Sequence, residues 1–271
     1  MQPSRRDDAA SSHSAAAGDA RTMAGYSADT YGRAFADVYD DWYHDLSDVD
    51  ALAALVDGRA PVGAVCELGV GTGRVALAIT ARGRRVIGID VSAEMLEQLA
   101  VNDTGRTIVA VRGDMVDDLG SATHGEHITA VVAAYNTVFN LHTESRQRAL
   151  FASVASVLAP DGIFIVEAAV PPSDDDHGTT VGVRSMTTER VVLSVARHHG
   201  DDHIAEGHFI EFTDGDRVRL RPWSIRYLTI AEIDQMATDA GLVLESRLAD
   251  WDGSTFTPGA DNHISIYRRP T

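Results

Sequence analysis

The chain has 271 residues, which is enough for one large domain or for a domain with a sizeable insertion. Its 44% hydrophobic content supports a packed core and excludes a wholly disordered protein. The formal net charge of −17 argues against nucleic acid as a partner, because phosphates require a basic surface. No apolar run approaches the length of a membrane helix, so we expect a cytoplasmic protein without a membrane partner.

Two regions precede the first strand that the sequence predicts. Residues 1–24 are rich in Ala, Ser and Asp and lack an apolar core, which indicates a disordered tail rather than a secretory signal. Residues 25–58 place apolar and aromatic side chains at helical spacing, so we expect a helical lid of two helices, broken near residues 45–48. The single cysteine, Cys66, follows in an apolar run and is expected to be a buried thiol.

Short apolar strands alternate with helices over residues 59–170. The strands are expected at 62–68, 85–90, 107–112, 128–134 and 163–170. Helices are expected at 74–82, after the N-cap residue Ser92, and at 143–158, where a turn at 160–162 follows. This alternation predicts an α/β fold with a doubly wound, mostly parallel sheet.

The pattern changes after residue 170. Residues 171–228 carry alternating segments without helical spacing, which predicts an antiparallel insertion of three or four strands. Thr229 and Glu232 form a capping-box pattern, which opens a helix that ends at Gly241. Strands at 242–249 and 263–267 are expected to return to the main sheet, so that residues 229–271 complete it.

The stretch ELGVGTGR, residues 67–74, places Gly69, Gly71 and Gly73 directly after the first strand. Bare backbone there lets N–H groups and a helix N-terminus approach a ligand closely. A nucleoside triphosphate would require a lysine after the loop, and the chain contains no lysine. A dinucleotide would require the spacing G-x-G-x-x-G, whereas this loop has G-x-G-x-G.

Three acidic residues favour another ligand, a nucleoside that carries an amino acid. Glu67, Asp90 and Asp114 end the first three parallel strands and are expected to meet at one edge of the sheet. In that order they suit an ammonium group, ribose hydroxyls and an adenine amine, with Met115 packed against the purine. Simpler explanations also exist, since Asp90 can be a helix cap and Asp114 can belong to an ordinary loop.

Residues 62–170 resemble the core of a class I S-adenosylmethionine-dependent methyltransferase. The resemblance implies a Rossmann-like sheet of seven strands with a reversed edge pair, and S-adenosylmethionine as the cofactor. It places the three glycines and Glu67 at the methionine part, Asp90 at the ribose, and Asp114 with Met115 at the adenine. It also implies that Tyr135 and Asn136 lie where the methyl group is transferred.

The N-terminal lid and the insertion resemble those of small-molecule N-methyltransferases, including enzymes that act on sugar amines. Tyr31, Tyr39 and Tyr43 are expected to line one face of a helix over the cofactor, unless they only pack that helix on the sheet. Tyr31 is therefore a candidate for cofactor binding, and the other two are candidates for acceptor binding.

Three further residues are candidates for the chemistry. His142 is either a base or a histidine that faces water at a helix start. His208 and Glu211 alternate on strands of the insertion and are candidates for the acceptor site. No metal site is expected, because the nearest cluster of ligand types, at 198–203, has the pattern of a hairpin tip.

These observations predict a methyltransferase that methylates an amine, once or twice. The expected acceptor is a small natural product or a modified ribosomal peptide, and the chain is expected to act as a monomer or a homodimer. The alternatives are an O-methyltransferase with His142 or His263 as base, a non-catalytic S-adenosylmethionine-binding protein, and a nicotinamide oxidoreductase.

Overall fold

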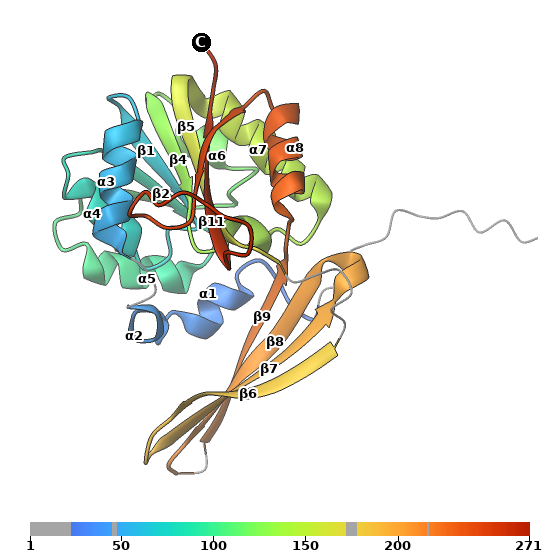
Figure 1. Ribbon diagram of the computed structural model, residues 1–271. Coiled ribbons are helices and arrows are strands. Elements are labelled where there is room, and N and C mark those ends of the chain that lie inside the picture. The colour runs from blue at the N-terminus through green and yellow to red at the C-terminus, as the bar shows by residue number, and fades with distance from the viewer. Residues whose placement is uncertain (1–22, 45–47, 172–177, 216) are drawn as a thin grey trace, which may run out of the picture.

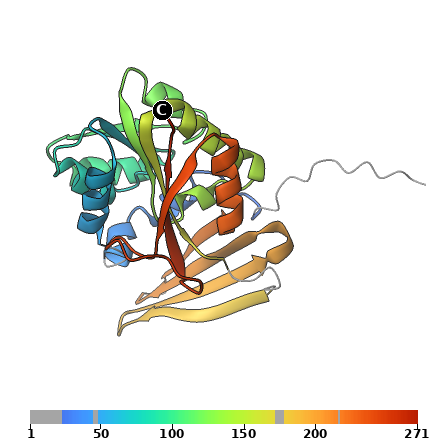
Figure 2. The same cartoon turned by 45° about the horizontal axis from the view of Figure 1, so that its top comes forward.

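The structure is a computed structural model that describes residues 23–44, 48–171, 178–215 and 217–271 (Figure 1). The tail expected at 1–24 lies outside the described residues except for its last two, and so do residues 45–47 of the expected helix break. The described chain forms a seven-stranded α/β unit from which a four-stranded antiparallel sheet projects, as Figures 1 and 2 show.

The helices of the described residues are mostly short. They are α1 (Thr30–Phe35), α2 (Tyr39–Tyr43), α3 (Val49–Arg59), α4 (Arg74–Thr80), α5 (Ala93–Asn102), α6 (Leu119–Ala122), α7 (Glu144–Val157) and α8 (Ile230–Asp239), with 3-10 helices η1 (Thr137–Asn140) and η2 (Gly200–Asp202). Within the parts of the chain that the structure describes, no helix is long and apolar enough to span a bilayer.

The strands form two sheets. The main sheet contains β1 (Ala64–Leu68), β2 (Val86–Asp90), β3 (Ile108–Arg112), β4 (Ile128–Ala133), β5 (Leu158–Ala169), β10 (Val243–Leu248) and β11 (Asn262–Arg268). The antiparallel sheet contains β6 (Gly178–Met186), β7 (Arg190–His199), β8 (Ile204–Thr213) and β9 (Arg217–Arg226).

The main sheet follows the order β10-β11-β5-β4-β1-β2-β3. Neighbouring strands run parallel except where β11 pairs with β5 and β10, so only β11 is reversed within the expected edge pair. The chain runs outward in both directions from β1 and β4. Open α/β sheets bind ligands at such a switch point, outside the carboxyl ends of the strands.

Helices cover both faces of the main sheet, which confirms the doubly wound α/β fold. Val56 of α3 and Ile79 of α4 are buried in one layer, and Phe151 of α7 and Ile233 of α8 are buried in the other. β1 and β4 are buried along their whole length, as expected for parallel strands covered on both sides. Cys66 lies in β1, where burial raises the pKa of its thiol to about 12.

Local capping explains where several helices begin. The side chains of Ser92 and Thr143 accept the N–H groups of Met95 and Arg146 at the starts of α5 and α7. The capping box at Thr229 is present and opens α8. Each cap supplies an acceptor for an N–H group that has no partner within its helix.

Two local expectations are wrong. The lid is not two helices, because residues 36–38 separate α1 from α2, and α3 is a third helix. The expected turn at 160–162 lies inside β5, where Asp161 has a left-handed φ of 61° and its N–H donates to the Arg269 carbonyl. The pairing with β4 shifts in register at this point, and the strand continues beyond the irregularity.

The antiparallel sheet has the order β6-β7-β8-β9, and it has two different faces. The inner face contacts α1 and carries Phe209, Arg221 and Trp223. The outer face carries a group of exposed apolar side chains, which we call the outer patch: Val181, Val183, Met186, Phe212, Val218 and Leu220. Both faces of the sheet therefore carry apolar side chains, and the inner face also carries the buried Arg221.

Candidate active site

A cavity of about 370 Å³ lies at the carboxyl ends of β1 to β4, beneath α1 and α2. Parallel pairing brings residues to this edge that lie far apart in the sequence. Most of the expected site residues line it: Tyr31, Tyr39, Tyr43, Glu67, Gly69, Gly71, Asp90, Asp114, Met115, Tyr135 and Asn136. The topology therefore assembles one site from the lid, the glycine loop and the ends of four strands.

The glycine loop follows β1 in a backbone conformation that favours glycine. Gly69, Gly71 and Gly73 have φ values of 63°, 54° and 87°, all in the left-handed region. A Cβ on Gly71 would have no heavy atom nearer than 3.9 Å, so it would project into the cavity. Gly73 does not line the cavity, because a Cβ there would meet Leu99 of α5 at 3.0 Å. Gly73 therefore packs the loop against a helix.

Glu67 presents an unsatisfied carboxylate to the cavity. Its side chain is buried, and its Oε2 atom has no hydrogen-bond partner. Burial raises the pKa of Glu67 well above its usual range, and the nearby Asp90 charge adds to this effect. A buried carboxylate oxygen without a donor fits the ammonium group of a methionine moiety, which would supply both charge and hydrogen bonds.

Asp90 ties the glycine loop to the start of α5. Its Oδ2 accepts the Gly71 N–H at 2.9 Å, and its Oδ1 accepts the Ser92 N–H at 2.8 Å. Burial raises the pKa of Asp90, although these N–H groups act in the opposite direction. Asp90 thus has the structural role of a cap, and it also lines the cavity, where each oxygen can accept a further bond from a ribose hydroxyl.

Asp114 is held by an arginine that the sequence did not single out. Arg146 Nη2 lies 2.6 Å from Asp114 Oδ1, and the same oxygen accepts the Val116 N–H at 2.7 Å. Asp114 and Met115 both line the cavity beyond β3. This arrangement orients the carboxylate and puts an apolar side chain beside it, as an adenine site would require.

Tyr135 and Asn136 follow β4 in a strained conformation. Their φ values of 52° and 63° are unusual for residues other than glycine and often mark functional sites. Asn136 Oδ1 accepts the Ala169 N–H at 2.6 Å, which fixes the amide and leaves its NH₂ group and one oxygen lone pair for a methyl-acceptor molecule. The Tyr135 N–H donates to Glu167 Oε2 at 2.8 Å, and the Arg74 guanidinium lies over the Tyr135 ring.

The lid tyrosines come from two helices and not from one helical face. Tyr31 lies on α1, whereas Tyr39 and Tyr43 lie on α2, and all three line the cavity. Their rings contact one another, with the centroids of Tyr31 and Tyr39 6.4 Å apart and those of Tyr39 and Tyr43 4.9 Å apart. Burial raises the pKa of Tyr31 and of Tyr39 well above the usual range, so both remain neutral phenols.

Four histidine and glutamate candidates lie away from the wall of this cavity. His142 Nε2 contacts the Ser224 carbonyl at 2.9 Å, and burial lowers the pKa of this half-buried ring. His263 is buried within β11, and its Nδ1 contacts Ser265. His208 lies on the outer face of the antiparallel sheet, because its neighbour Phe209 points inward.

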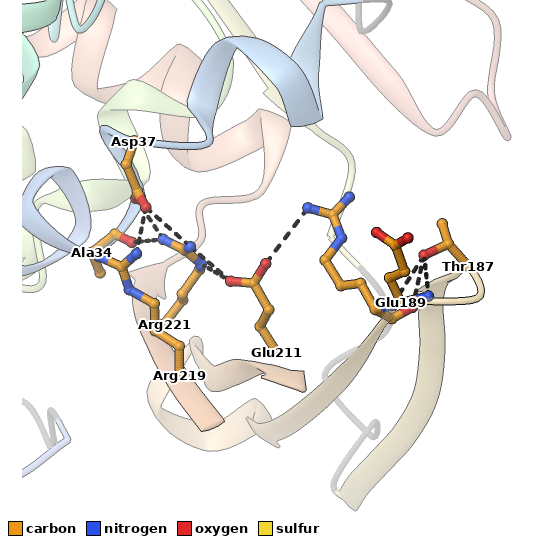
Figure 3. A network of polar contacts seen from close by, with 8 residues as sticks. Ala34, Asp37, Thr187, Glu189, Glu211, Arg219 and Arg221 are labelled. Carbon is orange, nitrogen blue, oxygen red and sulfur yellow. Dashed lines mark hydrogen bonds and ion pairs between the residues drawn. The ribbon is translucent and has the colours of Figure 1, made fainter. Parts of the chain in front are cut away.

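Glu211 is on the inner face, but it belongs to the ion cluster that Figure 3 shows. The buried Arg221 donates to Glu211 Oε2 at 2.8 Å, to Asp37 Oδ1 at 2.7 Å and to the Ala34 carbonyl at 2.5 Å. Arg219 contacts the same Asp37 from a more exposed position. Burial opposes ionisation of Asp37, but the hydrogen bonds and charge of Arg221 outweigh it and lower the pKa of Asp37.

The sequence did not reveal several residues that complete the cavity. Phe209, Trp223 and Ile225 of the antiparallel sheet line it opposite the strands of the main sheet. The alternation of apolar residues on β8 and β9 indicates that one face of these strands packs against something. The sequence does not show which face, because that depends on the strand register in the folded sheet.

Known proteins are similar to this chain in sequence and architecture. A family described as a methyltransferase domain matches residues 65–162. The solved CcbJ methyltransferase from Streptomyces caelestis is 34% identical, with a TM-score of 0.83, over 91% of this chain and 100% of that one. A cypemycin N-terminal methyltransferase from a Streptomyces species is 24% identical over 241 residues, 83% of this chain and 91% of the relative. The S-adenosylmethionine-bound structure of CalS10, an amino pentose methyltransferase from Micromonospora echinaspora, is 20% identical with a TM-score of 0.66, covering 86% and 96% of the two chains.

The chain belongs to the S-adenosylmethionine-dependent methyltransferases. This finding confirms the expected class, fold and cofactor, and it removes the nicotinamide oxidoreductase and the non-catalytic binding protein as alternatives. The cavity fits the cofactor in three respects: an unsatisfied carboxylate at Glu67, bare backbone at Gly71, and acceptor oxygens at Asp90.

Proposed function

We propose that this methyltransferase methylates an amine of a small natural product or of a modified ribosomal peptide, in one or two rounds. The observation that carries the proposal is the composition of the wall. Carboxylates and tyrosine rings line the cavity, whereas His142 and His263 do not. The aromatic faces suit a cationic amine, while a hydroxyl acceptor would require a base that the cofactor does not already engage.

Each cofactor-binding residue has a role in the proposal. Bound S-adenosylmethionine supplies an electrophilic methyl group on a sulfonium sulfur. Glu67 would hold the ammonium of its methionine part, Asp90 the ribose hydroxyls, and Asp114 with Met115 the adenine. The lid tyrosines would exclude water and surround the cationic centre, since desolvation and orientation supply much of the catalysis in such displacements.

The relatives support an amine over an oxygen acceptor. The cypemycin relative is an N-terminal methyltransferase, and it aligns along most of this chain. CalS10 acts on an amino pentose and shares the fold. A peptide N-terminus and a sugar amine therefore form the two acceptor classes to be tested first.

The test has two stages. Calorimetry should show binding of S-adenosylmethionine and S-adenosylhomocysteine but not of NADH. The protein should then be incubated with cofactor and three acceptors, namely an amino sugar, a peptide with a free N-terminus and a phenol, and the products weighed by mass spectrometry. We expect methyl addition to an amine, and none to a control peptide of the same sequence whose N-terminus is acetylated. Methylation of the phenol alone would overturn the proposal.

A further inference from the structure

A second cavity, which we call the side chamber, adjoins the first. Its volume is about 240 Å³, and it shares part of its wall with the main cavity. The residues that line both are Tyr31, Tyr39, Tyr43, Tyr135 and Asn136. Four other residues line only the side chamber: Glu167, Ala168 and Ala169 from β5, and Asn262 at the start of β11. A ligand in the main cavity and a ligand in the side chamber would therefore meet at the tyrosines and Asn136.

Glu167 is the carboxylate of the side chamber. It lies near the carboxyl end of β5, and two neutral donors hold it: the Tyr135 N–H at 2.8 Å on Oε2 and the Trp251 indole N–H at 3.1 Å on Oε1. These donors fix the orientation of the group and do not neutralise its charge. Each oxygen retains a lone pair for a further donor.

Several groups around Glu167 act on its pKa in opposite directions. Burial raises the pKa of Glu167 above its usual value, and the two N–H donors act in the opposite direction. Among the nearby charged groups, Arg74 lowers this pKa and Asp250 raises it. A partly buried carboxylate of this kind gains from a cation that enters the chamber, because that cation restores electrostatic stabilisation lost from water.

We propose that the side chamber is the acceptor subsite and that Glu167 receives the ammonium group of the acceptor amine. This inference rests on the proposed function. The tyrosine rings would stabilise the cation from the other sides. Before the nitrogen can react, one N–H proton passes to a Glu167 oxygen, which leaves a neutral amine with its lone pair and a neutral carboxylic acid. Burial raises the pKa of Glu167, so its carboxylate accepts this proton more readily than an exposed carboxylate would.

The test uses Trp251 as a reporter, because its indole N–H is bonded to Glu167. The probe is isobutylammonium, added at neutral pH to the protein saturated with S-adenosylhomocysteine, and the uncharged isobutanol is the control. We expect the indole resonance of Trp251, assigned with Trp251→Phe, to shift saturably with isobutylammonium and not with isobutanol. Glu167→Gln should abolish the shift and keep S-adenosylhomocysteine affinity within about twofold.

Two more variants keep the test decisive. Asp250→Asn removes a nearby exposed carboxylate that does not line the chamber, so isobutylammonium should still shift the Trp251 resonance saturably in this variant. Ala169→Leu narrows the chamber without touching the carboxylate and should abolish the response even where Glu167→Gln folds poorly.

The outcomes also separate this inference from the proposed function. An unchanged amine response in Glu167→Gln and Ala169→Leu, or no saturable response in the natural protein, would overturn the subsite while leaving methyl transfer to amines intact. Failure of S-adenosylhomocysteine to bind would instead count against the proposed function. With an amine acceptor from the mass screen, Glu167→Gln should raise KM for the acceptor at least ~10-fold and leave KM for S-adenosylmethionine unchanged.

Discussion

Arg221 Nη1 lies 2.7 Å from Asp37 Oδ1, although the two residues are 184 positions apart in the chain. Asp37 lies between α1 and α2, and Arg221 lies on β9 beside Phe209 and Trp223, which line the cavity. This contact therefore holds the tyrosine-bearing lid against the antiparallel sheet, and it fixes the separation of two walls of the active site.

Arg221→Met should destabilise the protein far more than Arg219→Met. The Arg221 side chain is 1% exposed, and its loss would leave the buried Glu211 with only the more distant Arg190, 3.5 Å away, at a cost of about 3 kcal/mol. Arg219 contacts the same Asp37 but is 55% exposed, so its loss should cost at most about 1 kcal/mol. Urea unfolding of both variants measures the difference. Equal losses would show that the buried cluster does not stabilise the lid.

Glu67→Gln should change how stability and cofactor binding depend on pH. Because the folded state raises the pKa of Glu67, it binds the proton more tightly than the unfolded chain does. This contribution to stability is complete below the ordinary value of 4.5 and is lost as pH rises through the folded pKa. Unfolding experiments across that range should therefore show that the free energy of unfolding declines as pH rises. Glu67→Gln should lack this decline.

Cofactor affinity should follow the opposite course. An ammonium group binds the ionised form of Glu67, so calorimetry should show S-adenosylhomocysteine affinity that rises with pH above the ordinary value of 4.5, as the buried Glu67 ionises. In Glu67→Gln the affinity should be at least ~10-fold lower and independent of pH in this range, which corresponds to about 1.4 kcal/mol. If this variant binds S-adenosylhomocysteine as tightly as the natural protein does, Glu67 does not bind the ammonium group.

Gly71→Ala should impair cofactor binding, and Gly83→Ala provides a matched control. Both glycines have left-handed φ values, 54° and 83°, so either alanine should cost about 1–2 kcal/mol of stability. Only Gly71 lines the cavity, and its new methyl group would occupy cofactor space. We expect S-adenosylhomocysteine affinity to fall at least ~10-fold in Gly71→Ala and to stay unchanged in Gly83→Ala. Equal affinities of the two variants for S-adenosylhomocysteine would mean that the ligand does not need to approach the backbone at Gly71.

The outer patch should mediate association of two copies of the chain. Val218 and Leu220 are directly opposite Phe212 and Ile210, so the patch is continuous across the strands, and large exposed apolar patches are uncommon on monomers. Two such faces can pack on each other as stacked sheets. Light scattering should detect a dimer that Leu220→Glu dissociates and Val62→Glu, at an exposed site elsewhere, does not. A monomeric natural protein would contradict this expectation.

The positions of the residues that we propose to bind the cofactor follow from the sequence because they depend on topology alone. Parallel strands place their carboxyl ends at one edge, so Glu67, Asp90 and Asp114 had to converge once the strands were recognised. The glycine loop could also be predicted, since glycine at these positions reflects the local backbone conformation. Gly73 is the exception, because its neighbour Leu99 belongs to another helix.

The acceptor side could not be predicted in the same way. His208 and Phe209 are adjacent on β8, and only the register and the packing of the sheet decide which one points to the cavity. The outer face of this sheet is also apolar, whereas the exposed face of an antiparallel sheet is usually polar. Glu167 lies within an apolar strand sequence, and its significance depends on contacts with Tyr135 and Trp251, which are 32 and 84 positions away.

The position of Cys66 gives the protein a reporter of its own unfolding. The only thiol of the chain is fully buried in the central strand, and burial raises the pKa of Cys66 to about 12. Alkylating reagents attack the thiolate, so they should modify the chain only when β1 is exposed. The rate of alkylation would then measure the population of opened molecules, even in an unpurified mixture, and would show how much bound cofactor suppresses that opening.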